Sequence, residues 1–388
     1  MSRLDPDTAP AEGDGPATDR DAPADLARPG AQGERPAGDT DASAADARVA
    51  AGDAIAAATQ REGGTEVPSK PTRPGPLGTS TFTIEGRAAP GLFVVGWLAT
   101  IIGAGILAVG VFAGGGPALA LILIGLSGLL VGLVAGAGSQ AIERRARGVP
   151  GYAGPSPLLV FAAVVPLTLL LEVAVGVPLT ALGLDTASPL AALIGLLLTA
   201  GAYVGLIRLL VVGTGALSWR EIGVRRPGGQ QLTELAIGGL MAFPLLVITG
   251  LLATVLATFL STPPSPLPIS GGVLGLLIDL VSAAVVAPIA EETFFRGFAT
   301  TAWVRAVGAN SAIVRGALFF AAAHVLTVGG DTFQMGAERA LFAFVARLPV
   351  ALALGWVFVR SRSLYASIGL HSVFNALPVL AYLVIGHG

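Results

Sequence analysis

Three groups of polar and aromatic residues lie in the C-terminal third of the chain, within stretches that are otherwise apolar. In chain order they are Glu291-Glu292 with Arg296, Phe320 with His324, and His371 with Asn375. Each group contains two residues four positions apart, which share one face of a helix. A carboxylate can act as a general base, and imidazole and amide groups can donate hydrogen bonds to an oxyanion. These residue types therefore fit hydrolysis by an activated water.

The two adjacent glutamates are expected to play different parts. On a helix, Glu292 faces Arg296, whereas Glu291 is turned about 100° away and can face another partner. Two neighbouring carboxylates at membrane depth cannot both ionise cheaply, so one is expected to be neutralised by the arginine. Glu291 is then the carboxylate left for chemistry.

The composition indicates which kind of element must position these groups. Of 388 residues, 53% are hydrophobic and 12% are charged, and the mean hydropathy is +0.75. A soluble chain carries about 25% charged residues, so the sequence predicts a polytopic membrane protein. The chain has no Cys, which excludes disulfides, thiol catalysis and thiolate metal sites. A net charge of −2 argues against a nucleic-acid partner.

The first 88 residues differ from the rest. They hold 24 of the 48 charged residues, of which 15 are acidic, together with ten Pro. Such a segment cannot bury enough apolar surface to fold. We expect residues 1–88 to form a disordered cytoplasmic tail, either a solvated tether or a segment that binds a partner.

The remaining 300 residues predict an all-α, polytopic membrane helical bundle of about nine transmembrane helices, because apolar runs of this length form spanning helices. We divide them into a four-helix membrane segment, 89–216, and a second domain, 217–388. Segment 298–309 is expected to be a short interfacial helix. The nine predicted spans are 91–113, 118–139, 157–178, 189–213, 234–260, 271–297, 310–327, 337–359 and 365–385.

The basic loops orient the spans. Arginines follow spans two, four, six and eight, and the loops 261–270 and 328–336 carry at most one charge. The positive-inside rule then places the N-terminus in the cytoplasm and the C-terminus outside. We expect a multi-pass protein of the plasma membrane.

Ionisable residues inside spans are functional candidates by default. Arg208, Arg315 and Glu172 lie near span ends and are expected to snorkel, whereas Asp279 and Arg347 lie deeper and are expected to pair structurally. Counted along their helices, Glu291, His324 and His371 lie about 9 to 14 Å from the cytoplasmic surface. Three helices thus bring chemical groups to one layer.

The ordered set Glu-Glu-x-x-x-Arg, Phe-x-x-x-His and His-x-x-x-Asn resembles the signature of the CPBP/Abi family, the intramembrane glutamic endopeptidases that include the CAAX prenyl endopeptidases. The resemblance covers about residues 234–388, and the stretch Trp219–Pro227 is similar to the family's usual lead-in.

The resemblance implies a role for each matched residue. Glu291 would activate water and His324 would help to position it. His371 and Asn375 would stabilise the oxyanion, with Glu292 and Arg296 supporting the site. It implies a hydrolase with no cofactor and no obligatory metal, acting on membrane-embedded or lipid-anchored peptides. The substrate, the cleavage site and any protein partner bound through the tail or spans one to four stay open.

Other enzyme classes are weaker interpretations. One or two Glu with two His can hold zinc, but the His-Glu-x-x-His motif is absent. Gly125-Leu126-Ser127-Gly128 is similar to a rhomboid serine motif, yet small residues in a span usually serve packing. Asp185 and Asp279 lack the context of an aspartyl protease.

Two interpretations involve no catalysis. The resemblance also allows a membrane scaffold or an immunity protein that protects against bacteriocins. A transporter is conceivable because the spans are interrupted by Gly and Pro, although no inverted repeat is evident. A scaffold should tolerate Glu291→Ala, whereas an enzyme should not.

Overall fold

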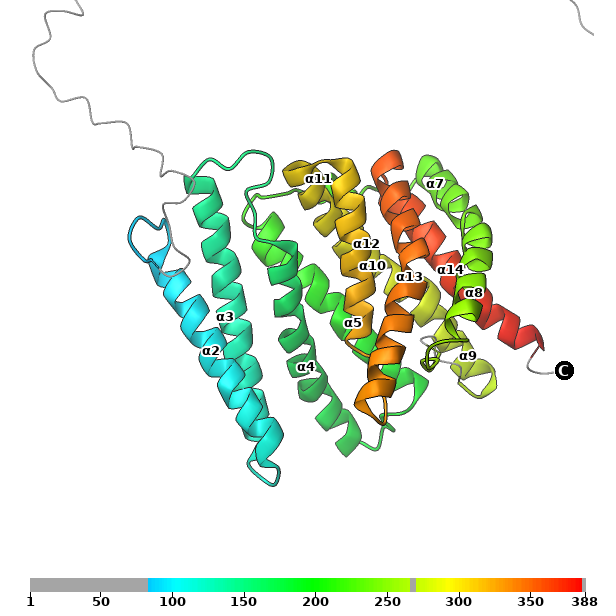
Figure 1. The fold of residues 1–388 in the computed structure, drawn as a ribbon, viewed down its shortest axis with the longest axis horizontal. Helices are drawn as coiled ribbons and strands as arrows, with labels where there is room; N and C mark the ends of the chain where they lie inside the picture. The colour runs from blue at the N-terminus through cyan, green and yellow to red at the C-terminus, as the bar shows by residue number, and fades with distance from the viewer. Residues whose placement is uncertain (1–82, 266–269, 386–388) are drawn as a thin grey trace, which may run out of the picture. The chain divides into compact units, whose positions relative to one another are not determined.

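The computed structural model describes residues 83–265 and 270–385, with side chains up to Tyr382, and within these ranges it is all helical (Figure 1). The predicted tail therefore lies outside the described residues except for 83–88. The first helices are α2 (Pro90–Ala113), α3 (Ala118–Ala146), α4 (Pro157–Ala181), α5 (Pro189–Leu206), the π-helix η1 (Ile207–Val212), α6 (Trp219–Ile222), α7 (Gly229–Leu240) and α8 (Ala242–Leu256). They are followed by α9 (Gly272–Val281), η2 (Ser282–Val286), α10 (Ala287–Glu292), η3 (Thr293–Thr300), α11 (Thr301–Val307), α12 (Ala309–Val325), α13 (Phe333–Ser361) and α14 (Leu364–Ile385).

The predicted helical membrane bundle is confirmed. Eight of the described helical runs are long and apolar enough to cross a membrane, and the other predicted span is the shorter apolar helix Ala309–Val325. One boundary differs from the prediction. The helical run that begins at Gly272 does not stop at residue 297 but continues through η3 into α11 (Thr301–Val307), so the short helix predicted within 298–309 is joined to the sixth span without a break. The run ends at Gly308, whose φ of 84° is favourable for glycine.

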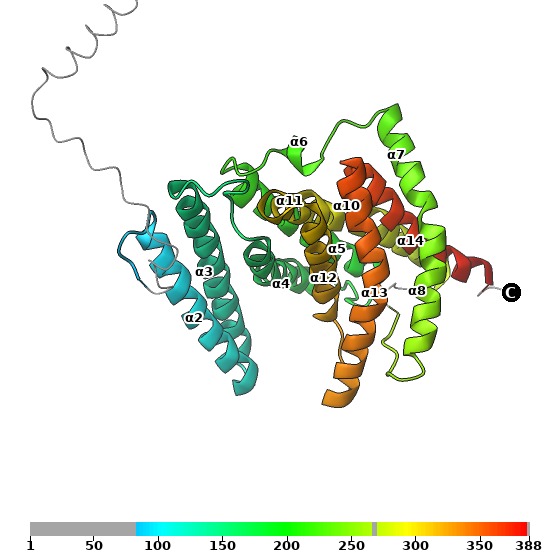
Figure 2. The same cartoon turned by 45° about the horizontal axis from the view of Figure 1, so that its top comes forward.

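Helices α2 and α3 form an antiparallel hairpin at one side of the described bundle (Figures 1 and 2). Glycines allow the two backbones to approach closely. A Cβ on Gly103 would lie 2.5 Å from the Leu129 nitrogen, and one on Gly125 would lie 2.5 Å from the Leu107 nitrogen. In lipid, helices associate through close packing and not through the hydrophobic effect, and small residues allow that packing. The glycines of α2 and α3 are therefore explained by the packing of these two helices.

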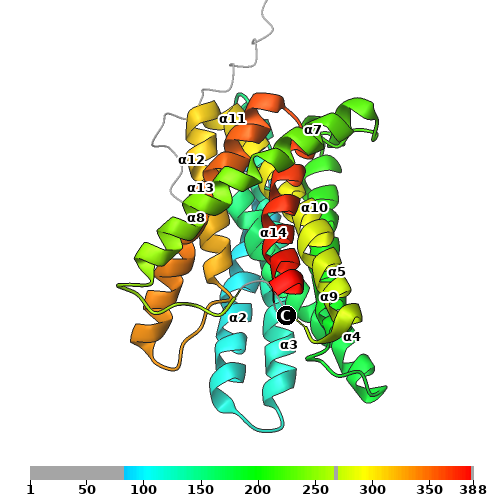
Figure 3. The same cartoon turned by 90° about the vertical axis from the view of Figure 1, so that its right-hand side faces the viewer.

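The C-terminal helix α14 runs among the later helices and contacts α7, α8, α10 and α13 (Figure 3). Its crossing with α7 is close, because a Cβ on Gly369 would lie 2.7 Å from the Leu235 carbonyl carbon. Helix α12 packs along α13. Helix α12 also contacts η3, which continues α10, and α14 contacts both α10 and η3, so the three helices that carry the predicted chemical groups are neighbours.

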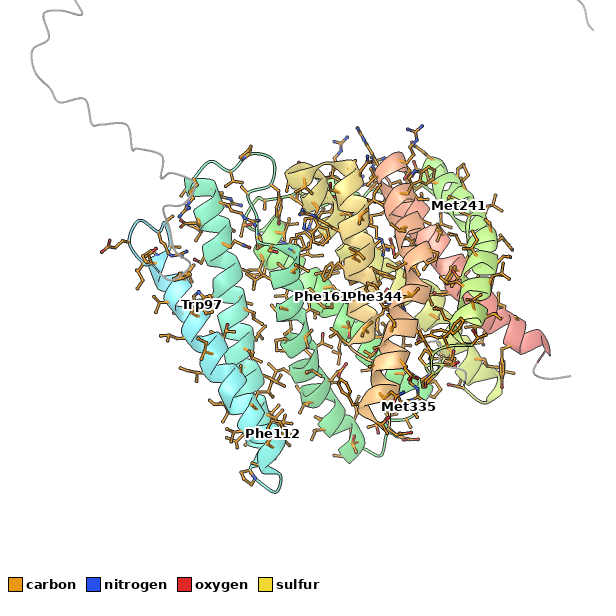
Figure 4. All side chains as sticks on the ribbon, in the orientation of Figure 1. Trp97, Phe112, Phe161, Met241, Met335 and Phe344 are labelled. Carbon is orange, nitrogen blue, oxygen red and sulfur yellow. The ribbon has the colours of Figure 1, made fainter. Side chains whose placement is uncertain are left out.

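An aromatic cluster joins the early and late helices. Phe294 on η3 packs against Tyr203 of α5 at 4.7 Å between ring centroids and against Phe161 of α4 at 5.9 Å. Figure 4 labels Phe161 in the middle of the bundle. Phe295 and Phe319 complete the cluster, with ring centroids 5.2 Å apart. The core therefore crosses the predicted boundary near residue 216, and the division at that point stays a prediction.

Candidate active site

Both glutamates lie on α10, a short α-helical segment between the π-helices η2 and η3. Pro288 explains part of this irregularity, because proline has no N–H and weakens a regular helix. In η2 the Ala287 N–H bonds to the Ser282 carbonyl, five residues back. In the same register residue 288 would bond to Ala283. Since residue 288 is proline, the Ala283 carbonyl needs a donor from elsewhere.

Asn375 of α14 is that donor. Its Nδ2 donates to the Ala283 carbonyl at 3.0 Å. The side chain thus ties α14 to the helix that carries the glutamates. An amide nitrogen has two N–H groups, so this bond leaves one for another acceptor.

Glu292 is the centre of a buried network. Its Oε1 accepts a hydrogen bond from Arg296 Nη1 at 2.8 Å and lies 2.9 Å from His371 Nδ1. Arg296 also bonds to the Ala351 carbonyl of α13 and lies 4.2 Å above the Phe320 ring. Glu292 and Arg296 are almost fully buried. A buried charge needs such pairing, so this network fixes the relative positions of α10, α13 and α14.

Glu291 faces a different partner, as predicted for neighbouring residues on a helix. Its Oε2 lies 3.6 Å from His324 Nε2 and 3.9 Å from His371 Nε2. These distances exceed a direct hydrogen bond and match groups that share one water. Among the described residues, Glu291 Oε2 has no hydrogen-bond partner.

The contacts of the Nδ1 atoms of His324 and His371 determine how the two imidazole rings are oriented. His324 Nδ1 lies 2.8 Å from the Phe320 carbonyl, which can only accept, so Nδ1 carries the proton. His371 Nδ1 likewise faces the Glu292 carboxylate. Both rings therefore present Nε2 to Glu291.

Exposure distinguishes the two sides of this cluster. The side chains of Glu291 and His324 are 20% and 25% exposed, whereas that of His371 is 7% exposed. The Glu291 and His324 side chains are thus partly exposed, although the Glu291 Oε2 atom that faces the two rings is itself buried, and Glu292 and Arg296 are buried more deeply. Five of the six predicted site residues thus lie in one connected cluster, and Asn375 is joined to the helix that carries the glutamates through the Ala283 carbonyl.

The other intramembrane charges lie apart from the reactive face or beside it. Arg208, Arg315 and Glu172 are exposed on their helices, where they contact the surroundings of the bundle. Asp279 is buried and accepts from the Ser270 N–H at 2.7 Å, which confirms a structural partner. Arg347 bonds to the Ala343 carbonyl at 3.2 Å and interacts electrostatically with Glu291. Arg347 lies one turn from Ala351 on the α13 face that contacts Arg296, so it adds positive charge beside the site.

Sequence reasoning missed two residues that shape the site. Gly297 follows Arg296, and a Cβ there would lie 2.8 Å from the Ile222 carbonyl oxygen. Helix α6 therefore approaches η3 closely, and Glu221 holds it by bonding to Arg305 at 2.6 Å. Pro288 is the second. In the sequence, the signal for an irregular helix at this point was a proline three residues before Glu291 within a predicted span.

Features of the rival enzymes are not assembled in the described part of the chain. No group of three or more His, Cys, Asp or Glu with metal-holding geometry was found there. Ser127 donates to the Leu123 carbonyl of its own helix, and Asp185 accepts from the Ala187 N–H beside α5. These hydrogen bonds join Ser127 and Asp185 to the backbone and not to a histidine.

Comparison with known proteins agrees with the location of the cluster. Residues 273–377 match the family model of the type II CAAX prenyl endopeptidases, described as Rce1-like. No curated protein and no solved structure showed significant similarity to the chain. The matched segment contains Glu291, Glu292, Arg296, His324, His371 and Asn375. The match over residues 273–377 supports assignment of this part of a multi-pass membrane protein to the CPBP/CAAX protease family.

Proposed function

We propose that the protein is an intramembrane endopeptidase in which Glu291 activates the attacking water. The observation that carries the proposal is the convergence of Glu291 Oε2 with His324 Nε2 and His371 Nε2 at 3.6 and 3.9 Å. A water between these three atoms has polar partners on each side, as an ordered water requires. Glu291 then takes a proton from the water while the oxygen attacks the scissile carbonyl carbon.

His324 serves as the residue that positions the water. Its Nδ1–H is donated to the Phe320 carbonyl, so in the neutral ring Nε2 is an acceptor aimed toward Glu291. With His324 Nε2 and the Glu291 carboxylate both accepting hydrogen bonds, the two protons of the water point toward the protein. A lone pair of the water oxygen then points toward the substrate. This orientation supports in-line attack.

His371 and Asn375 serve the oxyanion of the tetrahedral intermediate. Each already uses one donor within the protein, His371 toward Glu292 and Asn375 toward Ala283. These bonds fix both side chains, and preorganised donors stabilise a transition state better than mobile ones. The second N–H of the Asn375 amide is assigned to the substrate oxygen, and His371 Nε2 donates to it when the ring carries a proton on both nitrogens. Collapse of the intermediate passes the proton held by Glu291 to the leaving amine.

The proposed substrate is a peptide in the membrane or anchored to it by lipid. Glu291 lies on a helical run long and apolar enough to span the membrane, and His324 lies on the shorter apolar helix Ala309–Val325. Both side chains are partly exposed, which supports access from the bilayer. We place the N-terminus in the cytoplasm and the site nearer the cytoplasmic surface of the plasma membrane, on the basis of the arginine-rich loops. The chemistry uses no cofactor and no metal in this proposal.

Mass spectrometry of peptide termini tests the function in membranes of cells that carry wild type, Glu291→Ala or Glu172→Ala at equal abundance. Glu172 is the matched control because it is a glutamate of a span outside the site. We expect new termini with wild type and with Glu172→Ala but not with Glu291→Ala. Identical profiles for all three, together with a phenotype on gene deletion, would instead favour the non-proteolytic scaffold or immunity protein.

A further inference from the structure

Helix α5 brings a tyrosine hydroxyl to the helical run that carries the glutamates. This helix contacts α10, η2 and η3 (Figure 3). The Tyr203 ring of α5 lies 4.7 Å from the Phe294 ring and 6.2 Å from the Phe295 ring, measured between centroids. Phe294 and Phe295 follow Glu291 by three and four residues, which places all three on one side of the run. Tyr203 therefore packs against the side that carries the proposed base.

The hydroxyl of Tyr203 differs from those of two other tyrosines. Tyr152 donates to the Pro155 carbonyl at 2.9 Å, and Tyr365 donates to the Arg225 carbonyl at 2.8 Å. Tyr203 is only 8% exposed, yet its hydroxyl has no hydrogen-bond partner among the described residues. A buried tyrosine hydroxyl normally finds a partner, and one that does not calls for an explanation. The chemistry of the neighbouring site supplies one.

Tyr203 interacts electrostatically with Glu291. Titratable or charged groups from four other elements also lie near this glutamate, namely Arg296 of η3, His324 of α12, Arg347 of α13 and His371 of α14. Each of these four is held by a hydrogen bond to another part of the chain, whereas the Tyr203 hydroxyl has none within the described ranges. Helix α5 also precedes the matched family segment, so this interaction joins an early helix to the candidate active site.

We propose that Tyr203 is a positioning residue for the base, and that its hydroxyl donates a hydrogen bond to the Glu291 carboxylate through one water. This inference rests on the proposed function. The link is water-mediated because the hydroxyl has no direct partner in the described chain, and polar groups beyond direct reach are commonly joined in this way. The bridging water is distinct from the attacking one.

The shape of a carboxylate explains why a further donor matters. Its two oxygens accept from about four positions, so Glu291 can bind the bridging water while Oε2 faces the imidazoles of His324 and His371. The last torsion of a glutamate side chain has a broad distribution. A hydrogen bond from the Tyr203 side restricts that torsion and keeps the carboxylate aimed at the attacking water, which is the geometric condition for fast proton transfer.

Tyr203→Phe tests this role, because it keeps the ring against Phe294 and removes only the hydroxyl. The substrate is a lipid-anchored peptide that contains a cleavage site found by mass spectrometry of peptide termini, assayed in proteoliposomes. We expect kcat to fall about tenfold, since a small misplacement of a catalytic group has an effect of at least this size. KM should not change, because the hydroxyl touches no substrate. The thermal midpoint should not fall, because no hydrogen bond within the described chain is lost.

Tyr152→Phe is the matched control. It also removes a buried tyrosine hydroxyl, but one that is bonded to the Pro155 carbonyl. We expect a lower thermal midpoint and an unchanged kcat. A second comparison combines Tyr203→Phe with Glu291→Gln. Because Tyr203 acts through Glu291, adding Tyr203→Phe should leave the residual rate of Glu291→Gln unchanged, as a double-mutant cycle shows for coupled residues.

The possible failures of this inference differ from those of the proposed function. A wild-type kcat in Tyr203→Phe, with Glu291→Gln impaired, would overturn the role of Tyr203 and leave the protease proposal standing. A further tenfold fall in the double variant, a changed KM, or a midpoint as low as that of Tyr152→Phe would also overturn it, since Tyr203 would then act on substrate or on packing. Full activity in Glu291→Gln, or the absence of any cleavage site that depends on Glu291, would instead overturn the proposed function itself.

Discussion

Asn375 Nδ2 lies 3.0 Å from the Ala283 carbonyl oxygen, in the place where the π-helical register would put the missing N–H of Pro288. One side chain of α14 thereby completes the backbone of the helix that carries Glu291. The family resemblance assigns the same side chain to the oxyanion. The two N–H groups of the amide allow both roles, and they can be separated by experiment.

We expect Asn375→Ala to lower the rate of peptide hydrolysis by about a hundredfold through loss of an oxyanion donor. It should also lower the free energy of unfolding by about 1 to 3 kcal/mol, because a buried carbonyl loses its partner. Adding Pro288→Ala supplies an N–H toward Ala283. The double variant should therefore regain stability, measured by thermal unfolding, but not rate. Recovery of the rate as well would show that Asn375 acts through the backbone alone.

Substitution of the proposed base should separate activity from folding. Glu291→Gln keeps the shape of the side chain and removes its basicity, so we expect the rate to fall by about 10² to 10⁴. The unfolding transition should change little, because the Glu291 side chain is partly exposed and bonds to no described residue through Oε2. Hydrolysis of a peptide substrate in proteoliposomes gives the rate, with Glu172→Gln as the matched control. Full activity in Glu291→Gln would rule out its role as the base.

The neighbouring glutamate should behave in the opposite way. Glu292→Gln leaves Arg296 buried without a counter-charge, and breaking such a pair costs about 3 to 5 kcal/mol. We expect a large fall in the free energy of unfolding, measured by denaturant titration in micelles. Arg296→Met in the same chain removes the unpaired charge and should restore most of the loss. If Glu292→Gln unfolded like wild type, the network around its Oε1 would not be structural.

These pairs also show how far the sequence alone could lead. The i, i+4 spacing of Glu292 and Arg296 predicted their ion pair, which is confirmed at 2.8 Å. Convergence of the three histidine- and glutamate-bearing helices was predicted from their depth alone, and the structure brings them together. The Asn375–Ala283 bond was not predictable, because it depends on a π-helical register that leaves no periodic signal in hydropathy. The sixth span was predicted to end at residue 297, whereas the helical run continues to Val307 and Gly297 allows a close approach to α6.

Gly297 offers a direct check of that close approach. Gly297→Ala places a Cβ 2.8 Å from the Ile222 carbonyl oxygen, so the helices must shift. Overpacking of this kind costs about 1 to 3 kcal/mol, and we expect a lower thermal midpoint together with reduced hydrolysis. Gly250→Ala is the matched control, because a Cβ at that helical glycine meets nothing within 4 Å. Equal midpoints for the two variants would mean that α6 does not rest against η3.

The contact between α6 and the end of the glutamate run predicts a dependence on pH. The bond from Arg305, followed by bonds from Ser218, lowers the pKa of Glu221 to about 2. The pKa of a glutamate in an unfolded chain is about 4.3. Because the folded pKa is the lower one, the stabilisation is fully present above the unfolded pKa and is lost as the pH falls through the folded pKa. The relevant window is therefore acidic, between about pH 5 and pH 2.

We expect wild type to be more stable than Glu221→Gln at pH 6, by no more than about 1 kcal/mol because the pair is exposed to solvent. The difference should shrink as the pH falls toward the folded pKa of about 2, where Glu221 is half protonated in the folded chain, and should vanish only below it. Denaturant titrations of both variants in the same micelles at several pH values measure it. Arg305→Gln removes the partner of Glu221 and serves as a control. It should lose most of the stabilisation that wild type has over Glu221→Gln at pH 6. A gap that stays constant down to pH 2 would show that the Glu221 charge does not hold α6 against Arg305.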